Sequence, residues 1–118
     1  MEKTVLVVGL GNMGAALAGT LLGAGYDTWV WNRTKEKADI LLQKGALWSE
    51  SVWAAVGSVD YVVMCVSNYA SSVELLSTCP ELDEKVVIQL TTGTASDANS
   101  FEGLVRQKQG LYIDGAIM

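Results

Sequence analysis

The fold of this chain is decided by the stretch Thr4-Val5-Leu6-Val7-Val8-Gly9-Leu10-Gly11-Asn12-Met13-Gly14. Its first part, Val5–Val8, is a short apolar run rich in β-branched residues, which is typical of a strand buried on both faces. Apolar residues at helical spacing follow the glycines, at Met13, Leu17, Leu21 and Leu22. The pattern Gly-x-Gly-x-x-Gly therefore stands where a strand turns into a helix.

Each glycine of this pattern has a physical role in holding a dinucleotide. Gly9 permits the tight turn, Gly11 lets backbone N–H groups approach a pyrophosphate, and Gly14 lets the helix pack closely on the strand. The helix N-terminus adds unpaired N–H groups and a partial positive charge. We predict a dinucleotide site formed by Gly9, Leu10, Gly11, Asn12, Met13 and Gly14. The alternative is a sheet in which the glycines serve packing alone.

Composition indicates a globular chain and excludes several partners. The chain has 118 residues, half of them apolar, and a net charge of -5. We expect residues 1–118 to form one nucleotide-binding domain. The acidic balance offers no basic surface for nucleic acid, and no apolar run reaches the ~20 residues of a membrane span. Met1-Glu2-Lys3 leads directly into the first strand, so we expect no signal peptide and a cytoplasmic location.

The supply of catalytic and metal-binding side chains is small. Histidine is absent, which removes the commonest general base and metal ligand. Two cysteines, Cys65 and Cys79, are too few for a zinc site or a disulfide framework. We expect no metal site, and we interpret Cys65 as a small buried residue of a strand.

The rest of the chain alternates predicted strands and helices. The strands are Thr28–Trp31, Leu47–Trp48, Tyr61–Val66, Val86–Leu90 and Leu111–Ile113. The first predicted helix after Thr28–Trp31 contains Ala38, Leu41 and Leu42 and is capped by Thr34. The next two are Ser51–Val56 and Ser71–Leu76, and the last begins at Thr94 or Ser96 and ends at Lys108. This alternation predicts an α/β fold, a Rossmann-type doubly wound parallel sheet in three αβα layers. Ligands of such sheets lie beyond the carboxyl ends of the strands.

Residues after the second predicted strand favour NADP over NAD. NAD-binding domains usually place Asp or Glu about 20 residues past the glycines, where it accepts hydrogen bonds from ribose hydroxyls. Here Asn32 holds that position, followed by Arg33 and Thr34. A guanidinium pairs with the 2′-phosphate of NADP, and the Thr34 hydroxyl and the Lys37 ammonium can add to that contact. The alternative is that Arg33 and Lys37 are solvated surface charges.

Two motifs together resemble a known superfamily. Gly9–Gly14, followed by Trp31-Asn32-Arg33-Thr34-Lys35-Glu36-Lys37, closely resembles the cofactor domain of the β-hydroxyacid dehydrogenases. That superfamily includes 6-phosphogluconate dehydrogenase and the imine reductases. The resemblance implies an NADPH-dependent oxidoreductase that transfers hydride to a C=N or C=O carbon of a small-molecule substrate.

Two later segments look most like those of imine reductases. They are Gln89-Leu90-Thr91-Thr92-Gly93-Thr94 and Tyr112-Ile113-Asp114-Gly115-Ala116-Ile117-Met118. Gln89 stands where hydroxyacid dehydrogenases usually have aspartate, and Ala116 stands where they have proline. A β-hydroxyacid dehydrogenase, or a glyoxylate or semialdehyde reductase, is therefore the less favoured alternative.

The resemblance also implies roles for residues at and just after the ends of the later predicted strands. It implies that the ribose on the nicotinamide side is lined by Cys65, Val66, Ser67 and Asn68, that Thr92 approaches the nicotinamide, and that the substrate edge holds Asp114, Gly115 and Ala116. The alternatives are a buried strand for Cys65-Val66 and an ordinary turn for Asp114-Gly115.

The superfamily continues, past the position of Met118, into a helical domain that supplies the proton-transfer residue and most of a homodimer interface. We therefore expect this chain to be a piece of a longer protein, with no catalytic residue of its own. We expect it to bind NADP(H) without turnover, and to self-associate through apolar surface that the helical domain would cover. A dinucleotide-sensing regulatory module is a further alternative, and Asn32-Arg33 argues against a site for FAD or S-adenosylmethionine.

Overall fold

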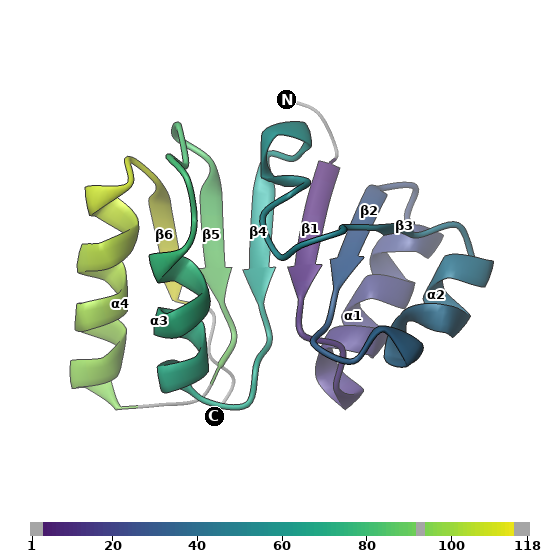
Figure 1. Ribbon diagram of the computed structural model, residues 1–118, viewed down its shortest axis with the longest axis horizontal. Coiled ribbons are helices and arrows are strands. Elements are labelled where there is room, and N and C mark those ends of the chain that lie inside the picture. Colours follow the sequence, from purple (N-terminus) through teal and green to yellow (C-terminus); the bar gives the residue numbers. More distant parts are fainter. Residues whose placement is uncertain (1–3, 92–93, 115–118) are drawn as a thin grey trace.

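Six parallel strands form the centre of the computed structural model, which describes residues 4–91 and 94–114 (Figure 1). The strands are β1 (Thr4–Val8), β2 (Asp27–Trp31), β3 (Leu47–Trp48), β4 (Tyr61–Met64), β5 (Val86–Gln89) and β6 (Leu111–Asp114). Their order in the sheet is β3-β2-β1-β4-β5-β6. This is the strand order of the Rossmann fold, so the predicted fold class is confirmed.

Helices cover the sheet on both faces. They are α1 (Asn12–Gly23), the 3₁₀ turn η1 (Lys35–Ala38), α2 (Asp39–Gln43), the 3₁₀ turn η2 (Val56–Ser58), α3 (Tyr69–Ser77) and α4 (Ala95–Gln107). Helices α1 and α2 lie beside β1 to β3, whereas α3 and α4 lie on the opposite face, over β4 to β6 (Figure 1). Within residues 4–91 and 94–114, no helix is long and apolar enough to cross a membrane.

The central strand β1 contributes to a core on each side of the sheet. Val5 and Val7 pack with Ala18 of α1, whereas Leu6 and Val8 belong to the cluster under α3 and α4. All of these β1 side chains are at most 3% exposed. The unbroken apolar run therefore follows from burial on both faces, because successive side chains of a strand point to opposite sides.

Helix α4 is capped by Thr94, one of the two residues that the sequence offered, and the cap is a capping box. The Thr94 hydroxyl accepts a hydrogen bond from the Asp97 N–H at 3.0 Å, and the Asp97 carboxylate accepts one from the Thr94 N–H at 3.0 Å. Farther along the helix, Phe101 is fully buried, and its ring lies 6.0 Å from that of Tyr69 and 5.8 Å from that of Tyr112. The aromatic cluster fixes α4 against α3 and β6.

The predicted helix Ser51–Val56 is wrong. The segment forms turns that lead into η2 at Val56–Ser58. The Trp53 indole N–H donates to the carbonyl oxygen of Leu75 at 2.7 Å and to Thr78 Oγ1 at 3.1 Å. This contact with α3 stabilises the turns. Because its partners are more than 20 residues away in the sequence, the local pattern of residues does not predict it.

The predicted second helix is divided, and its predicted cap is wrong. A 3₁₀ turn at Lys35–Ala38 precedes α2, which begins at Asp39. Thr34 stands at the N-cap position of the 3₁₀ turn, but its side chain makes no capping hydrogen bond. The segment that follows β2 is consequently a tighter turn than a regular helix start.

The face of β5 and β6 on the α1 side of the sheet is partly open. Val86 pairs with Leu111 and Ile88 pairs with Ile113 in the parallel register, so these side chains share one face. Leu111 and Ile113 are 52% and 51% exposed. A cavity of about 390 Å³ extends along α1 on this side and is lined by Val5, Leu17, Leu21, Tyr26, Tyr61, Val63, Ile88 and Leu90. Parallel sheets are normally covered on both faces, so this surface favours association.

We expect the 118-residue chain to self-associate, and Ile113→Lys to weaken that association, because a charge on the open face opposes its burial. Sedimentation velocity over a concentration series measures the effect. Ile40 is 66% exposed on α2, and Ile40→Lys is the matched control that should leave association unchanged. A wild-type chain that stays a monomer at high concentration would contradict the expectation.

Candidate functional site

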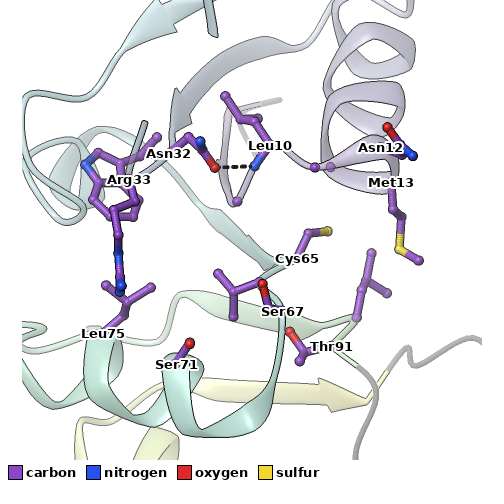
Figure 2. Close-up of a pocket in the computed structure, with 16 residues that line it drawn as sticks. Leu10, Asn12, Met13, Asn32, Arg33, Cys65, Ser67, Ser71, Leu75 and Thr91 are labelled. Atoms are coloured by element: carbon purple, nitrogen blue, oxygen red, sulfur yellow. Dashed lines mark hydrogen bonds between the residues drawn. The ribbon is translucent and has the colours of Figure 1, made fainter. Parts of the chain in front are cut away.

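A cavity of about 430 Å³ opens at the carboxyl ends of the strands (Figure 2). It lies at the ends of β1 and β4, which are neighbours in the sheet. The strand order reverses at this point, since the chain continues from β1 to β2 on one side and from β4 to β5 on the other. Doubly wound sheets bind ligands in this crevice, and the volume suits a small molecule. The lining residues are Gly9, Leu10, Gly11, Asn12, Met13, Gly14, Trp31, Asn32, Arg33, Cys65, Val66, Ser67, Ser71, Leu75, Leu90 and Thr91.

Close packing requires two of the three motif glycines. Gly9 has φ +99°, and a Cβ atom there would lie 2.4 Å from the carbonyl oxygen of Cys65. A Cβ atom on Gly14 would lie 1.9 Å from the carbonyl oxygen of Gly9. These contacts bring the turn after β1, the start of α1 and the end of β4 together. The roles expected for Gly9 in the turn and for Gly14 in helix packing are therefore present.

Gly11 differs, because no atom lies within 4 Å of where its Cβ would be. It lines the cavity and stands at the N-cap position of α1, where no side chain makes a capping hydrogen bond. The first N–H groups of a helix have no partners within the helix. Bare backbone at the start of α1 therefore borders the cavity and is suited to an anion.

Asn32 connects this glycine turn to the end of β2. Its Oδ1 accepts a hydrogen bond from the Leu10 N–H at 2.8 Å (Figure 2), and its Nδ2 donates to the carbonyl oxygen of Thr34 at 2.9 Å. Asparagine is suited to this position because its amide both accepts and donates. A carboxylate could accept from Leu10 but could not donate to Thr34. Sequence reasoning did not foresee this connection.

Arg33 lies at the rim of the cavity. Figure 2 shows its side chain extending toward the helix that carries Ser71 and Leu75. There its Nη2 lies 3.7 Å from Oε1 of Glu74, and the two side chains are 70% and 75% exposed. Thr34 and Lys37, predicted to assist Arg33, are exposed in the η1 segment and are not among the lining residues.

The loop after β4 contributes the opposite wall. β4 ends at Met64, two residues before the predicted end, so Cys65 and Val66 lie in the loop and line the cavity with Ser67. Asn68 instead caps α3, where its Oδ1 accepts a hydrogen bond from the Ser71 N–H at 2.9 Å. Cys65 was expected to be a buried residue of the strand, but it is half-buried in the loop; burial raises the pKa of its thiol to about 11.

Position at or just after the end of a parallel strand pointed to Trp31 and Thr91, and both line the cavity. Sequence reasoning missed three lining residues, namely Ser71, Leu75 and Leu90. Leu90 was assigned to the preceding strand, but β5 ends one residue earlier, at Gln89. Ser71 and Leu75 depend on how α3 is rotated about its axis, which the sequence does not give. Thr92, Gly115 and Ala116 lie outside the described residues, and Asp114 ends β6 beside Gln89.

Buried polar groups hold Thr91 in place. Gln89 is fully buried, and its Oε1 accepts a hydrogen bond from the Thr91 N–H at 2.9 Å. The Thr91 hydroxyl lies 3.4 Å from that of Ser72, which is also fully buried. The backbone leaving β5 is thus fixed at the edge of the cavity. In the described part of the chain, no group of three or more His, Cys, Asp or Glu side chains is placed to hold a metal ion.

The glycines give a test that separates folding from binding. We expect Gly14→Ala to lower the free energy of unfolding by about 1–3 kcal/mol or more, because the added methyl group overlaps Gly9. Gly11→Ala should fold normally but weaken NADP⁺ binding about tenfold or more, because its methyl group holds a pyrophosphate away from the amides. Thermal denaturation and titration calorimetry measure the two effects. Unchanged binding by Gly11→Ala would show that no pyrophosphate contacts this turn.

The raised pKa of Cys65 predicts slow alkylation. With a pKa of about 11, the thiolate is ~0.1% of the population at pH 8, compared with about a quarter for an ordinary cysteine. The iodoacetamide rate should therefore rise about tenfold per pH unit between pH 8 and 10. Mass spectrometry of a Cys79→Ala variant isolates the Cys65 signal. Rapid labelling at pH 8 would contradict the prediction.

Known proteins share this fold. The "NADPH-dependent reductive aminase" of Aspergillus oryzae is 35% identical, over all of this chain and 40% of the relative. An imine reductase from Pseudomonas sp. superposes with a TM-score of 0.94 at 36% identity, over all of this chain and 42% of its own. An imine reductase from Myxococcus stipitatus in complex with NADP⁺ has a TM-score of 0.92 at 40% identity, over 98% of this chain and 41% of its own.

The chain thus spans about two fifths of the length of these relatives. The superfamily resemblance read from the glycine motif and from Trp31–Lys37 is confirmed. The closer likeness to imine reductases, read from the segments that begin at Gln89 and Tyr112, is confirmed as well. A family model, described as the NAD binding domain of 6-phosphogluconate dehydrogenase, matches residues 4–117. This chain belongs to that family.

Proposed function

We propose that the cavity binds NADP(H), and that this chain is the cofactor-binding part of an NADPH-dependent oxidoreductase of the imine-reductase type. One observation carries the proposal. Arg33 stands at the cavity rim next to the bare turn at Gly11, and an amide, Asn32, replaces the carboxylate expected for NAD. A guanidinium favours a 2′-phosphate, which a carboxylate would repel.

The proposed orientation of the cofactor follows from the walls of the cavity. The pyrophosphate lies on the amides at Gly11 and the first turn of α1, and the 2′-phosphate lies at Arg33. The nicotinamide end then extends past Ser67 toward Thr91. The resemblance to imine reductases implies that Thr92 approaches the nicotinamide and that the substrate edge holds Asp114, Gly115 and Ala116, and we propose these roles here. When bound, the dinucleotide supplies the hydride, and these residues hold and orient it.

Relatives support the choice of cofactor. The Aspergillus oryzae relative is named as NADPH-dependent, and the Myxococcus stipitatus structure contains NADP⁺. Gln89, in the place of the hydroxyacid dehydrogenases' aspartate, supports reduction of a C=N carbon over hydroxyacid chemistry.

We place the rest of the activity in the longer protein. We propose that residues beyond this chain supply the proton-transfer group and form a homodimer, and that residues 1–118 act as one cofactor-binding domain. A cytoplasmic location is proposed as well.

The choice between NADP and NAD is tested at Arg33. We expect Arg33→Ala to weaken NADP⁺ binding by about 1.5–3 kcal/mol, roughly 10- to 150-fold, and to leave NAD⁺ binding nearly unchanged. The reason is the loss of a charge-assisted hydrogen bond that only the 2′-phosphate receives. Titration calorimetry with both cofactors measures the difference.

Lys37→Ala is the matched control, because this lysine is exposed in the same segment but does not line the cavity. It should change neither affinity strongly. Equal losses for NADP⁺ and NAD⁺ in Arg33→Ala would contradict recognition of the 2′-phosphate by this residue.

A further inference from the structure

The guanidinium proposed to bind the 2′-phosphate already faces an anion of the protein. Glu74 projects from α3, one residue before the lining residue Leu75, and its Oε1 lies 3.7 Å from Nη2 of Arg33. The pair joins two elements that form different walls of the cavity. The chain's other described ion pair, Arg106 with Glu102, lies within the single helix α4.

The environment of the pair makes it easy to exchange. Its side chains are 70% and 75% exposed, and the separation of 3.7 Å exceeds that of a charge-assisted hydrogen bond. Exposed pairs of this kind contribute little to stability. A phosphate carries a charge of about -1.5 to -2 and offers several acceptor oxygens, so it can displace the carboxylate.

Displacement has a cost that depends on the cofactor. A ligand with a 2′-phosphate must end the contact between Arg33 and Glu74 before the guanidinium can receive the phosphate. NAD has a hydroxyl at that position, so it can bind with the pair intact. The carboxylate therefore disfavours one cofactor and not the other.

We propose that Glu74 is a specificity-determining residue, whose carboxylate competes with the 2′-phosphate of NADP(H) for Arg33 and so reduces the preference for NADP(H) over NAD(H). This inference rests on the proposed function, because it assumes that Arg33 receives the phosphate. Arg33 supplies the attraction, and Glu74 limits it.

The test is Glu74→Gln in the 118-residue chain, which keeps the size of the side chain and removes its charge. At low ionic strength, titration calorimetry should show NADP⁺ binding roughly two- to fivefold tighter, the equivalent of about 0.4–1 kcal/mol, with NAD⁺ binding unchanged. Added salt should reduce the gain. Glu102→Gln removes a carboxylate that also pairs with an arginine, but outside the cavity, and should leave both affinities unchanged.

Repeating Glu74→Gln in an Arg33→Ala background separates the possible outcomes. Competition predicts that the gain disappears there; a gain of the same size would mean that Glu74 repels the phosphate directly, and would overturn the inference. If Arg33→Ala weakens NADP⁺ binding but Glu74→Gln does not strengthen it, the inference is wrong and the proposed function stands. If Arg33→Ala has no effect on NADP⁺, the proposed phosphate contact itself is wrong.

Discussion

The rest of the structure depends on the close approach of three backbone segments at the switch point of the sheet. The turn after β1, the first turn of α1 and the end of β4 meet where a Cβ on Gly9 would overlap Cys65 and a Cβ on Gly14 would overlap Gly9. This contact brings the N-terminus of α1 to the carboxyl edge of the sheet. Bare backbone at Gly11 thereby comes to border the cavity.

Charge at the site is arranged around these amides with few ionisable groups. The turn at Gly11 is neutral backbone, the connection to β2 is the amide of Asn32, and the charged groups Arg33 and Glu74 face each other at the exposed rim. Cys65, the titratable residue of the inner wall, stays protonated near neutral pH because burial raises its pKa to about 11. An anion here would therefore meet backbone amides and the Arg33 guanidinium, and no thiolate at Cys65.

Sequence reasoning was most successful where the signal was local. The apolar run of β1, the glycine motif and the alternation of strands and helices led to the correct sheet, because burial on both faces leaves a pattern in consecutive residues. It failed where distant contacts decide. Ser51–Val56 is held as turns by the indole of Trp53 on α3, and the partner of Arg33 lies on a helix whose rotation no local pattern reveals. Asn32 lines the cavity, but its two hydrogen bonds within the protein depend on the folded shape of two turns, which no local pattern encodes.

Those two hydrogen bonds have a geometric consequence. Asn32 joins the N–H of Leu10, beside the amides of the α1 turn, to the backbone that carries Arg33. For a ligand with phosphates at both points, the protein sets their separation before the ligand arrives. The cavity then selects ligands by the distance between their two anionic groups as well as by their charge. An isomer phosphorylated elsewhere on the ribose would therefore carry the right charge at the wrong distance.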